Sequence, residues 1–296
     1  MTSCCALEGM LRRDEPLAMR TTFRIGGPAA LFAEPAERDS FAAAYAEALA
    51  TGRAVYILGG GSNLLISDEG LNGIVLSTRR LASRRPERHG ERVFVLAGTS
   101  LVALVNWSAA NELAGLEGLV GIPGTVGGAL RMNAGGRHGC IGERVARLWL
   151  ADRAGRICEK VAAEMAWGYR SGEIADPVLG VEFQLRREPG TAVLRRRTEI
   201  LQAKSAAQPM RSHSAGCFFK NPDGDSAGRL IEMAGLKGCR IGDACVSPKH
   251  ANFIVNLGRA RATDVLRLAG AVRERVRDLY GIVLESEVHC WPQISL

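Results

Sequence analysis

Two glycine-rich segments could place rows of main-chain amides against a bound molecule. Glycine segment 1 covers residues 59–64 and reads GGGSNL, and glycine segment 2 covers residues 115–136, where apolar residues separate the glycines. Glycine has no Cβ, so its amides can approach a ligand closely, and a row of amides can satisfy phosphate or carbonyl oxygens. Both segments are therefore candidate walls of a cofactor site. The alternatives are a tight hairpin for the first and a buried connection without a ligand for the second.

Ionisable side chains stand out at three other places. Tyr169 and Arg170 lie in an expected loop, Cys217 stands beside two phenylalanines, and Glu285 and Glu287 share the last expected strand. Each has an ordinary explanation, because arginine is usually solvated, cysteine is often a small core residue and a strand glutamate usually faces water. Taken one at a time, these residues do not assign a function.

Short strands and helices are expected along the whole chain. Glycine segment 1 joins two strands without a following amphipathic helix, so it is neither a P-loop nor the dinucleotide fingerprint of a doubly wound sheet. Strict alternation in the last strand would place Glu285, Glu287 and His289 on one face. We expect two strands around a turn at 26–27, further strands at 54–58, 64–66, 73–77, 93–96, 145–151, 156–160, 178–186, 251–256 and 282–291, and helices at 36–51, 100–113, 191–207, 227–234 and 263–280. Residues 166–172 and 237–248 are expected to be irregular. Thr99 or Ser100 can cap the second helix and Ser226 the fourth, the last helix is expected to end at Gly281, and the strands at 145–151 and 156–160 are expected to form a hairpin that turns at Gly155.

The composition is that of an ordinary globular protein. Hydrophobic residues make up 47% of the chain and charged residues 23%. The length of 296 residues is enough for about two domains. No apolar run approaches the roughly 18 residues of a membrane span, and the first twenty residues lack the apolar core of a signal peptide. We therefore expect a cytoplasmic protein without a membrane partner.

The charge and the cysteines exclude several classes of site. The net charge of +7 comes mostly from scattered arginines without aromatic interleaving, which argues against nucleic acid and favours anionic small molecules as partners. The eight cysteines form no CxxC pair and have no histidines at zinc-finger spacing. Reduced thiols and no metal site are expected.

Six ordered motifs together resemble the UDP-N-acetylenolpyruvoylglucosamine reductase family. They read GGGSNLLISDEG, GLVGIPGTVGGALRMNAG, YRSG, SAGCFFKNP, GLKG with KHANFIVN, and LESEV. The chain is similar to the shorter form of the family. The resemblance implies an α+β fold, in which a two-lobed FAD-binding module of the vanillyl-alcohol oxidase type precedes a smaller α/β substrate-binding domain. The implied parts are an N-terminal extension (1–20), FAD-binding lobe 1 (21–78), FAD-binding lobe 2 (79–190), a connecting helix (191–208) and the substrate-binding domain (209–296).

The resemblance implies FAD as the bound cofactor and NADPH as the reductant. Amides of both glycine segments suit a cofactor that carries two phosphates and a carbonyl-rich ring. Segment 1 would hold the pyrophosphate and segment 2 the rest. The implied contacts are Leu58, Gly59, Gly60, Gly61, Ser62, Asn63 and Leu64, then Gly121, Ile122, Pro123, Gly124, Thr125, Gly127 and Gly128, then Asn133, Ala134 and Gly135.

The family's reaction implies roles for the ionisable residues. NADPH passes a hydride to the flavin, which passes one to the methylene carbon of an enolpyruvyl group and completes UDP-N-acetylmuramate for peptidoglycan. The resulting enolate needs nearby donors, a role that falls to Arg170 with Glu287 assisting as a protonated hydrogen-bond donor. Glu285 receives no role. Tyr169, Lys220 and Asn221 match the part of the family that binds the nucleotide sugar.

The proton donor is one of three places where this chain departs from the usual pattern of the family it resembles. Many members carry a serine at the position of Cys217. A thiol has an ordinary pKa near about 8.5, so it is mostly protonated at neutral pH and is a stronger acid than a hydroxyl. Cys217 is therefore expected to act as the general acid. Thr21 also replaces a commoner asparagine, and Gly136, Arg137 and His138 follow the Asn133 motif where a small residue and a tyrosine are usual.

Two other functions stay open at the level of sequence. One is an FAD-dependent oxidase of the same fold that acts on an alcohol or sugar, although no histidine motif indicates covalent flavin attachment. The other is a non-catalytic flavin or nucleotide carrier. A monomer is expected in each case.

Overall fold

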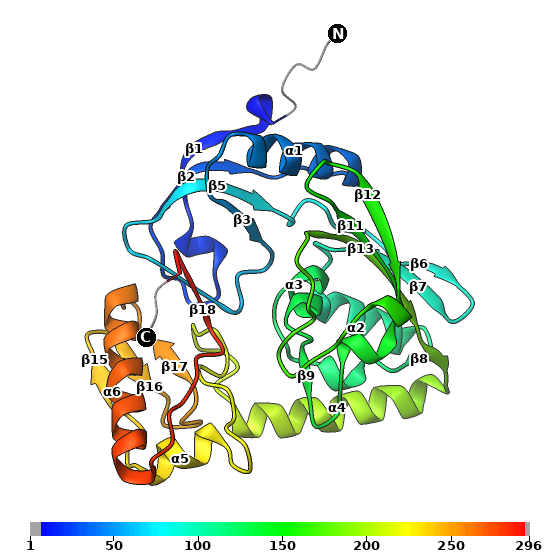
Figure 1. Ribbon diagram of the computed structural model, residues 1–296. Coiled ribbons are helices and arrows are strands. Elements are labelled where there is room, and N and C mark those ends of the chain that lie inside the picture. The colour runs from blue at the N-terminus through cyan, green and yellow to red at the C-terminus, as the bar shows by residue number, and fades with distance from the viewer. Residues whose placement is uncertain (1–6, 294–296) are drawn as a thin grey trace. The chain divides into compact units, whose positions relative to one another are not determined.

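The computed structural model describes residues 7–293 (Figure 1). The chain forms two compact units with separate hydrophobic cores. Unit 1 comprises Met1–Arg13, Leu31–Gly60 and Asn72–Ala203, and unit 2 comprises Asp14–Ala30, Gly61–Leu71 and Lys204–Leu296. The chain passes between the units repeatedly, so neither unit is one continuous stretch. Glycine segment 1 begins in unit 1 and continues in unit 2.

The main sheet of unit 1 is antiparallel and has the strand order β12-β11-β13-β7-β6. Strand β7 alternates buried and more exposed side chains, and its Val93 and Val95 are fully buried, whereas the central strand β13 is buried over its first four residues. Helices α2 and α3, which are labelled in Figure 1, contribute Leu104 and Leu130 to the same core. The bounds are β6 Glu87–His89, β7 Arg92–Leu96, α2 Leu101–Ala110, α3 Val126–Arg131, β11 Val145–Ala151, β12 Ile157–Val161 and β13 Val178–Gln184.

A second core in unit 1 lies between α1 and β5. Phe41 and Ala44 of α1 cluster there with Ile74 and Leu76 of β5. Strands β3 and β5 pair in parallel within a four-stranded sheet of order β1-β2-β5-β3. The bounds are β1 Arg12–Pro16, β2 Pro28–Ala33, α1 Arg38–Ala50, β3 Val55–Leu58 and β5 Leu71–Ser77.

Helix α4 (Gly190–Ala207) follows the main sheet and buries one side chain completely, Val193, against Ala109 and Ala114. Its other side chains are partly or fully exposed, so polar contacts must supply much of its attachment. The remaining short elements outside unit 2 are β8 Leu113–Ala114, which pairs with β14 Arg186–Arg187, the pair β9 Gly135–Gly136 and β10 Gly139–Cys140, and the 3₁₀ helices η1 Glu8–Met10, η3 Glu117–Leu119, η4 Ile141–Arg144 and η5 Ala162–Glu164.

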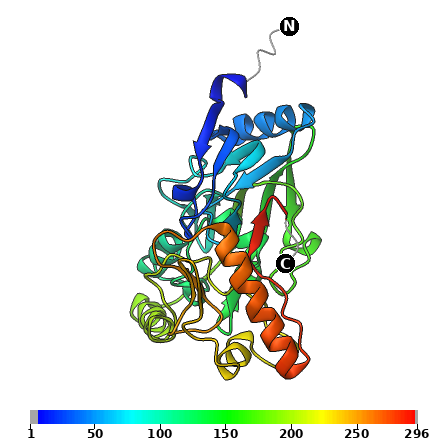
Figure 2. The ribbon, with the colours of Figure 1, turned by 90° about the vertical axis from the view of Figure 1, so that its left-hand side faces the viewer.

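Unit 2 packs the long helix α6 and the short helix α5 against an antiparallel sheet of order β15-β16-β17; α6 is the long orange helix in Figure 2. Val265 and Leu268 of α6 share their core with Val246 of β16 and Ile254 of β17. The bounds are η2 Ala18–Arg20, β4 Leu64–Ile66, α5 Ala227–Met233, β15 Arg240–Ile241, β16 Ala244–Val246, β17 Ile254–Asn256, α6 Ala262–Tyr280 and β18 His289–Trp291.

Both ends of α6 are fixed by local chemistry. At its start, the carboxylate of Asp68 accepts hydrogen bonds from the amides of Ala262 and Thr263 at 2.8 and 3.2 Å. A carboxylate at this place satisfies amides that lack a partner within the helix and interacts favourably with the helix dipole. At its end, Gly281 adopts the left-handed conformation with φ of 71°. Asp68 thus ties residues 61–71 to the rest of unit 2.

The expected α+β class is confirmed, and so are several local expectations. The strands β11 and β12 form the expected hairpin, with Gly155 at a φ of 80°. Ser100 and Ser226 cap α2 and α5, and their side chains accept from the amides of Ala103 and Arg229. The helix expected at 191–207 corresponds to α4.

Three expected elements are wrong. Residues 21–25 form no strand, because Arg24 has a φ of 58° and the Thr21 hydroxyl bonds locally to the carbonyl of Ala18 at 3.1 Å. Residues 237–248 are not irregular, because β15 and β16 form a hairpin. Its two-residue turn contains Gly242, whose φ is 54°.

The last strand is also much shorter than expected. Only His289–Trp291 forms β18, while Ser286 makes an isolated bridge to Phe219. Regular alternation therefore does not hold over residues 282–288, although Leu284 and Val288 are buried and Glu285 is exposed. Glu287 is half-buried rather than part of a regular exposed face.

None of the helices within residues 7–293 combines the length and the apolar character that a membrane span requires.

Candidate active site

The two glycine segments approach each other backbone to backbone within unit 1. A Cβ on Gly60 would lie 2.5 Å from the Cα of Gly124, and a Cβ on Gly59 would lie 2.6 Å from the Oγ1 of Thr125. Glycine is therefore required at position 60, where the close atoms belong to the main chain, whereas a Cβ at position 59 would displace the Thr125 hydroxyl. Gly121 and Gly124 also have φ values of 80° and 112°, a conformation that other residues rarely adopt.

Only some amides of these segments are available to a ligand. Among the described residues, the amides of Gly59, Gly60 and Gly124 donate to no acceptor of the protein. By contrast, Gly127 donates to the carbonyl of Ala97 at 2.8 Å and Gly128 to the Thr125 hydroxyl at 3.4 Å. The cradle of amides without side chains fits a cofactor rich in phosphate and carbonyl oxygens. Gly127 and Gly128 would line it without donating.

Asn133 holds the loop that carries Arg170. Its side-chain amide donates to the carbonyl of Gly168 at 3.0 Å, and its side-chain oxygen accepts from the amide of Gly142 at 3.1 Å. Asn133 is only 7% exposed and has a φ of 40°. Its side chain therefore joins glycine segment 2 to residues 166–172, a function that its position in the sequence does not reveal.

Arg170 is attached directly to glycine segment 2. Its Nη1 donates to the carbonyl of Gly135 at 2.8 Å, and its guanidinium carbon lies 5.3 Å from the ring centre of Tyr169. The main chain of Arg170 has a φ of 56°, which costs energy for a residue with a Cβ. A strained arginine whose guanidinium is directed at a glycine-rich segment suits the recognition of an anion. Tyr169 is 59% exposed.

In unit 2, main-chain hydrogen bonds join the segments of Cys217 and Glu287. The amide of Glu287 donates to the carbonyl of Phe218 at 2.8 Å, and the amide of Lys220 donates to the carbonyl of Glu285 at 2.8 Å. Cys217, which precedes Phe218, makes an isolated bridge to Phe253. Both Cys217 and Glu287 are half-buried. The fold thus brings together two candidate residues that lie 70 positions apart in the chain.

Asn63 of glycine segment 1 is hydrogen-bonded to the segment that carries Glu287. The side-chain amide of Asn63 donates to the carbonyl of Glu287 at 3.0 Å, and the amide of His289 donates to the carbonyl of Asn63 at 3.1 Å. From there β4 and β18 pair in parallel, with His289 opposite Leu64. The side chain of Asn63 therefore positions the glutamate segment.

The other residues expected to bind the substrate, Lys220 and Asn221, make weak or local polar contacts. Lys220 lies 3.2 Å from the carboxylate of Glu285, in a surface pair that is worth only about 0–1 kcal/mol. A bound diphosphate could replace such a partner at low cost. The side-chain oxygen of Asn221 accepts from the amide of Ala227 at 3.1 Å, so it supports the start of α5.

Arg170 belongs to unit 1, and Cys217 and Glu287 belong to unit 2.

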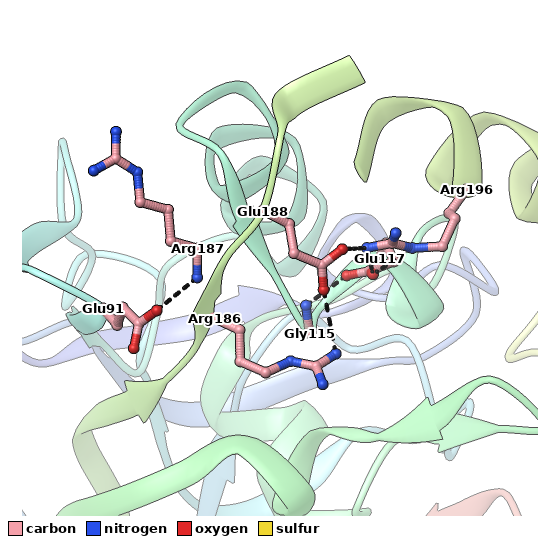
Figure 3. Close-up of polar contacts among 7 residues, drawn as sticks. All are labelled: Glu91, Gly115, Glu117, Arg186, Arg187, Glu188 and Arg196. Atoms are coloured by element: carbon pink, nitrogen blue, oxygen red, sulfur yellow. Dashed lines mark hydrogen bonds and ion pairs between the residues drawn. The ribbon is translucent and has the colours of Figure 1, made fainter. Parts of the chain in front are cut away.

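A network of charged residues that the sequence did not single out attaches α4 to glycine segment 2 (Figure 3). Arg196 of α4 donates to the carboxylate of Glu117 at 2.8 and 3.0 Å and to that of Glu188 at 2.7 Å. Glu117 in turn accepts from the amide of Gly115 at 2.6 Å. Arg196 lies in a run of three arginines, which from sequence alone is indistinguishable from a solvated basic face.

Burial opposes the charge of Glu117 and acts to raise its pKa, but the hydrogen bonds from Gly115 and Arg196 outweigh burial and lower the pKa overall. Because the folded-state pKa is lower than the ordinary value of 4.5, the carboxylate stabilises the fold above that pH. This stabilisation is lost as the pH falls through the folded-state pKa.

The variant Glu117→Gln is expected to lose about 1.5–3 kcal/mol of unfolding free energy at neutral pH. In acid the difference from the parent protein should shrink, because the parent carboxyl is then protonated too. Urea denaturation across this pH range measures both effects. Glu199→Gln, an exposed glutamate of α4, is the matched control and should change stability little. If the difference in unfolding free energy between Glu117→Gln and the parent stays constant with pH, the charge of Glu117 does not contribute to stability.

Family models match two parts of the chain. One, described as FAD binding domain, matches residues 29–159. The other, described as UDP-N-acetylenolpyruvoylglucosamine reductase, C-terminal domain, matches residues 208–291. The first match contains both glycine segments, and the second contains Cys217 and Glu287.

Curated proteins and a solved structure are similar to the chain over nearly its full length. UDP-N-acetylenolpyruvoylglucosamine reductase 2 of Symbiobacterium thermophilum is 44% identical over 291 residues, which cover 96% of this chain and 92% of that protein. The reductase of Geobacter metallireducens is 41% identical over 284 residues, which cover 95% and 94%. The crystal structure of the Thermus caldophilus reductase has a TM-score of 0.82 and 39% identity, and the match covers 95% of this chain and 100% of that one.

Proposed function

Because the chain belongs to the UDP-N-acetylenolpyruvoylglucosamine reductase family, we propose that Arg170, Cys217 and Glu287 are the residues with which it reduces its substrate. The reaction is the NADPH-dependent reduction of the enolpyruvyl group of UDP-N-acetylglucosamine enolpyruvate to UDP-N-acetylmuramate, a peptidoglycan precursor. FAD, when bound, takes up a hydride from NADPH and supplies one to the methylene carbon of the substrate. The observation that carries the assignment is the main-chain link between Glu287 and Phe218, the neighbour of Cys217.

The residues that would hold FAD are those of the two glycine segments. The amides of Gly59, Gly60 and Gly124 can donate to its pyrophosphate and carbonyl oxygens, which supports the expected binding role of these loops. Asn63 and Asn133 contribute in another way, because their side chains hold the segments of Glu287 and Arg170. The other binding residues assigned are Leu58, Gly61, Ser62, Leu64, Gly121, Ile122, Pro123, Thr125, Gly127, Gly128, Ala134 and Gly135.

Arg170 would stabilise the anion that follows hydride addition. The negative charge of the enolate is delocalised onto the substrate carboxylate, and a guanidinium can donate to it through several N–H groups. Its bond to the carbonyl of Gly135 fixes one end of the guanidinium in advance. Glu287 would assist by donating a hydrogen bond in its protonated form.

Cys217 would deliver the proton that completes the reaction. Its thiol gives a proton to the carbon next to the substrate carboxylate, a C–H bond forms as the enolate is consumed, and the resulting thiolate recovers a proton from water. Thiols are mostly protonated at neutral pH, so the acid is available without a further residue. Tyr169, Lys220 and Asn221 would bind the nucleotide-sugar part of the substrate.

We also propose that the protein is a monomer and that it acts in the cytoplasm. The six cysteines that the structure describes are all free thiols, which suits a reducing compartment. The net charge of +7 suits an anionic nucleotide-sugar substrate.

The purified, FAD-loaded protein is expected to be reduced by NADPH under anaerobic conditions and reoxidised by the enolpyruvyl sugar nucleotide. Flavin absorbance follows both half-reactions. Reoxidation by oxygen with an alcohol or sugar as the electron donor, without turnover of the enolpyruvyl substrate, would instead identify an oxidase. A protein that cannot be reconstituted with FAD would contradict the assignment altogether.

A further inference from the structure

The segment that carries Cys217 has an unusual support on the side away from Glu287. Asn252 is a buried side chain, 3% exposed, that precedes β17. Its side-chain oxygen accepts from the amide of Phe219 at 2.9 Å, and its side-chain nitrogen donates to the carbonyl of Phe219 at 2.7 Å. One side-chain amide thus satisfies both main-chain groups of a single residue, as a neighbouring strand would.

The main chain of Asn252 adds a third bond to the same segment. Its carbonyl accepts from the amide of Phe218 at 2.7 Å. Phe218 and Phe219 are 1% and 2% exposed, so water cannot replace these partners, and an unsatisfied buried amide or carbonyl is costly. Residues 218 and 219 therefore have one strongly preferred main-chain position.

The opposite side of this segment holds Glu287. The carbonyl of Phe218 accepts from the amide of Glu287, and the amide of Lys220 donates to the carbonyl of Glu285. The register between residues 217–220 and 285–287 thus depends on where Asn252 fixes Phe218 and Phe219. No regular sheet spans these segments, since the structure has only isolated bridges here, at Cys217 with Phe253 and at Phe219 with Ser286.

We propose that Asn252 is a positioning residue for the proton donor, and that its side-chain amide sets the register in which Cys217 and Glu287 act. The inference rests on the proposed roles of these two residues. Proton transfer requires the acid within hydrogen-bond reach of the carbon that accepts the proton, so a small displacement of residues 217–220 slows that step. NADPH oxidation requires no proton from Cys217.

Asn252→Ser is expected to slow flavin reoxidation by the enolpyruvyl substrate by about tenfold or more, while flavin reduction by NADPH changes by less than about twofold. Stopped-flow absorbance of the FAD-loaded protein measures the two rates separately. Asn252→Asp, which keeps the shape and the acceptor but loses the donor, should show the same split and serves if Asn252→Ser does not fold.

Asn256→Ser is the matched control. Asn256 is also a buried asparagine, and its side chain bonds to the carbonyl of Phe23 and to the amides of Gly258 and Ala260. These partners lie outside residues 217–220 and 285–287, so the loss of this side chain should lower the melting temperature comparably without altering the ratio of the two rates. An equal effect of Asn252→Ser on both half-reactions, or the same split in Asn256→Ser, would overturn the positioning role.

A second measurement needs neither turnover nor substrate. Iodoacetamide labelling, resolved by mass spectrometry of the peptides, should modify Cys217 about tenfold faster in Asn252→Ser than in the parent, because the half-buried segment opens more readily. Cys158, an exposed cysteine of β12, is the internal reference. Unchanged labelling of Cys217 relative to Cys158 contradicts the inference.

The variant Cys217→Ala distinguishes a failure of the proposed proton donor from a failure of the positioning role of Asn252. If Cys217→Ala reoxidises its flavin at the parent rate, the proposed proton donor is wrong. If Cys217→Ala is inactive in this half-reaction while Asn252→Ser and Asn252→Asp both behave like the parent, only the positioning role fails.

Discussion

Replacing Cys217 with alanine is expected to slow reduction of the enolpyruvyl substrate by about 10²–10⁴-fold and to leave NADPH-dependent flavin reduction intact. Alanine cannot donate a proton, and the enolate that forms would return to substrate rather than proceed to product. Anaerobic stopped-flow experiments resolve the two half-reactions. The same pattern is expected when Cys217 is alkylated in the parent protein.

Cys217→Ser is the matched control, because it replaces the thiol with a hydroxyl and changes little else. The hydroxyl is a weaker acid than the thiol, but it keeps a transferable proton in a side chain of similar size. Activity should therefore be largely retained in Cys217→Ser and lost in Cys217→Ala. Full turnover of Cys217→Ala would remove Cys217 from the mechanism and indicate that water or another residue supplies the proton.

Arg170→Ala is expected to reduce the rate of the substrate half-reaction by about 10²–10³-fold, the typical effect of removing one donor from a developing anion. The physical reason is that, in the proposed role, the guanidinium would stabilise charge that develops during the reaction rather than charge that is present beforehand. The loss should therefore fall mainly on the rate of flavin reoxidation at saturating substrate. Stopped-flow reoxidation across a range of substrate concentrations separates the maximal rate from the apparent affinity.

Arg170→Lys tests whether geometry matters beyond charge. Lysine keeps the positive charge but lacks the planar fork, so it cannot bond to the carbonyl of Gly135 and face the substrate in the same way. An intermediate loss is expected. Arg195→Ala, an exposed arginine of α4 that lies 3.9 Å from Glu199, is the control for loss of one positive charge and should be nearly neutral. If Arg195→Ala and Arg170→Ala lower the rate equally, the effect is one of overall charge and not of the anion site.

Much of the local structure could be predicted from the sequence, because its causes lie within a few residues. Ser100 and Ser226 start helices through bonds to amides three residues later, and Gly281 ends α6 by adopting a conformation that other residues avoid. The hairpin at Gly155 follows from the same kind of reasoning. The hairpin at Gly242 was missed, since the strands on either side of it contain only two and three residues.

The short last strand was mispredicted for a different reason. Alternating side chains over residues 282–291 predict a regular strand, yet pairing is limited to Ser286 with Phe219 and to β18 with β4. Pairing requires a partner strand in register, and the sequence of one strand does not contain that information. The half-buried position of Glu287 follows from this interrupted pairing.

The sequence by itself determined the order of the motifs that resemble the reductase family, the two glycine segments whose amides suit a cofactor, and the presence of a thiol at position 217. Only the tertiary structure decided which side chains hold these parts. Asn252 fixes Phe219 over 33 residues of chain, Asn63 holds Glu287 over 224, and Glu117 meets Arg196 over 79. A polar side chain looks the same in sequence whether it binds a ligand, faces water or supports the backbone. Which of these it does depends on burial and on the partners that distant segments bring to it.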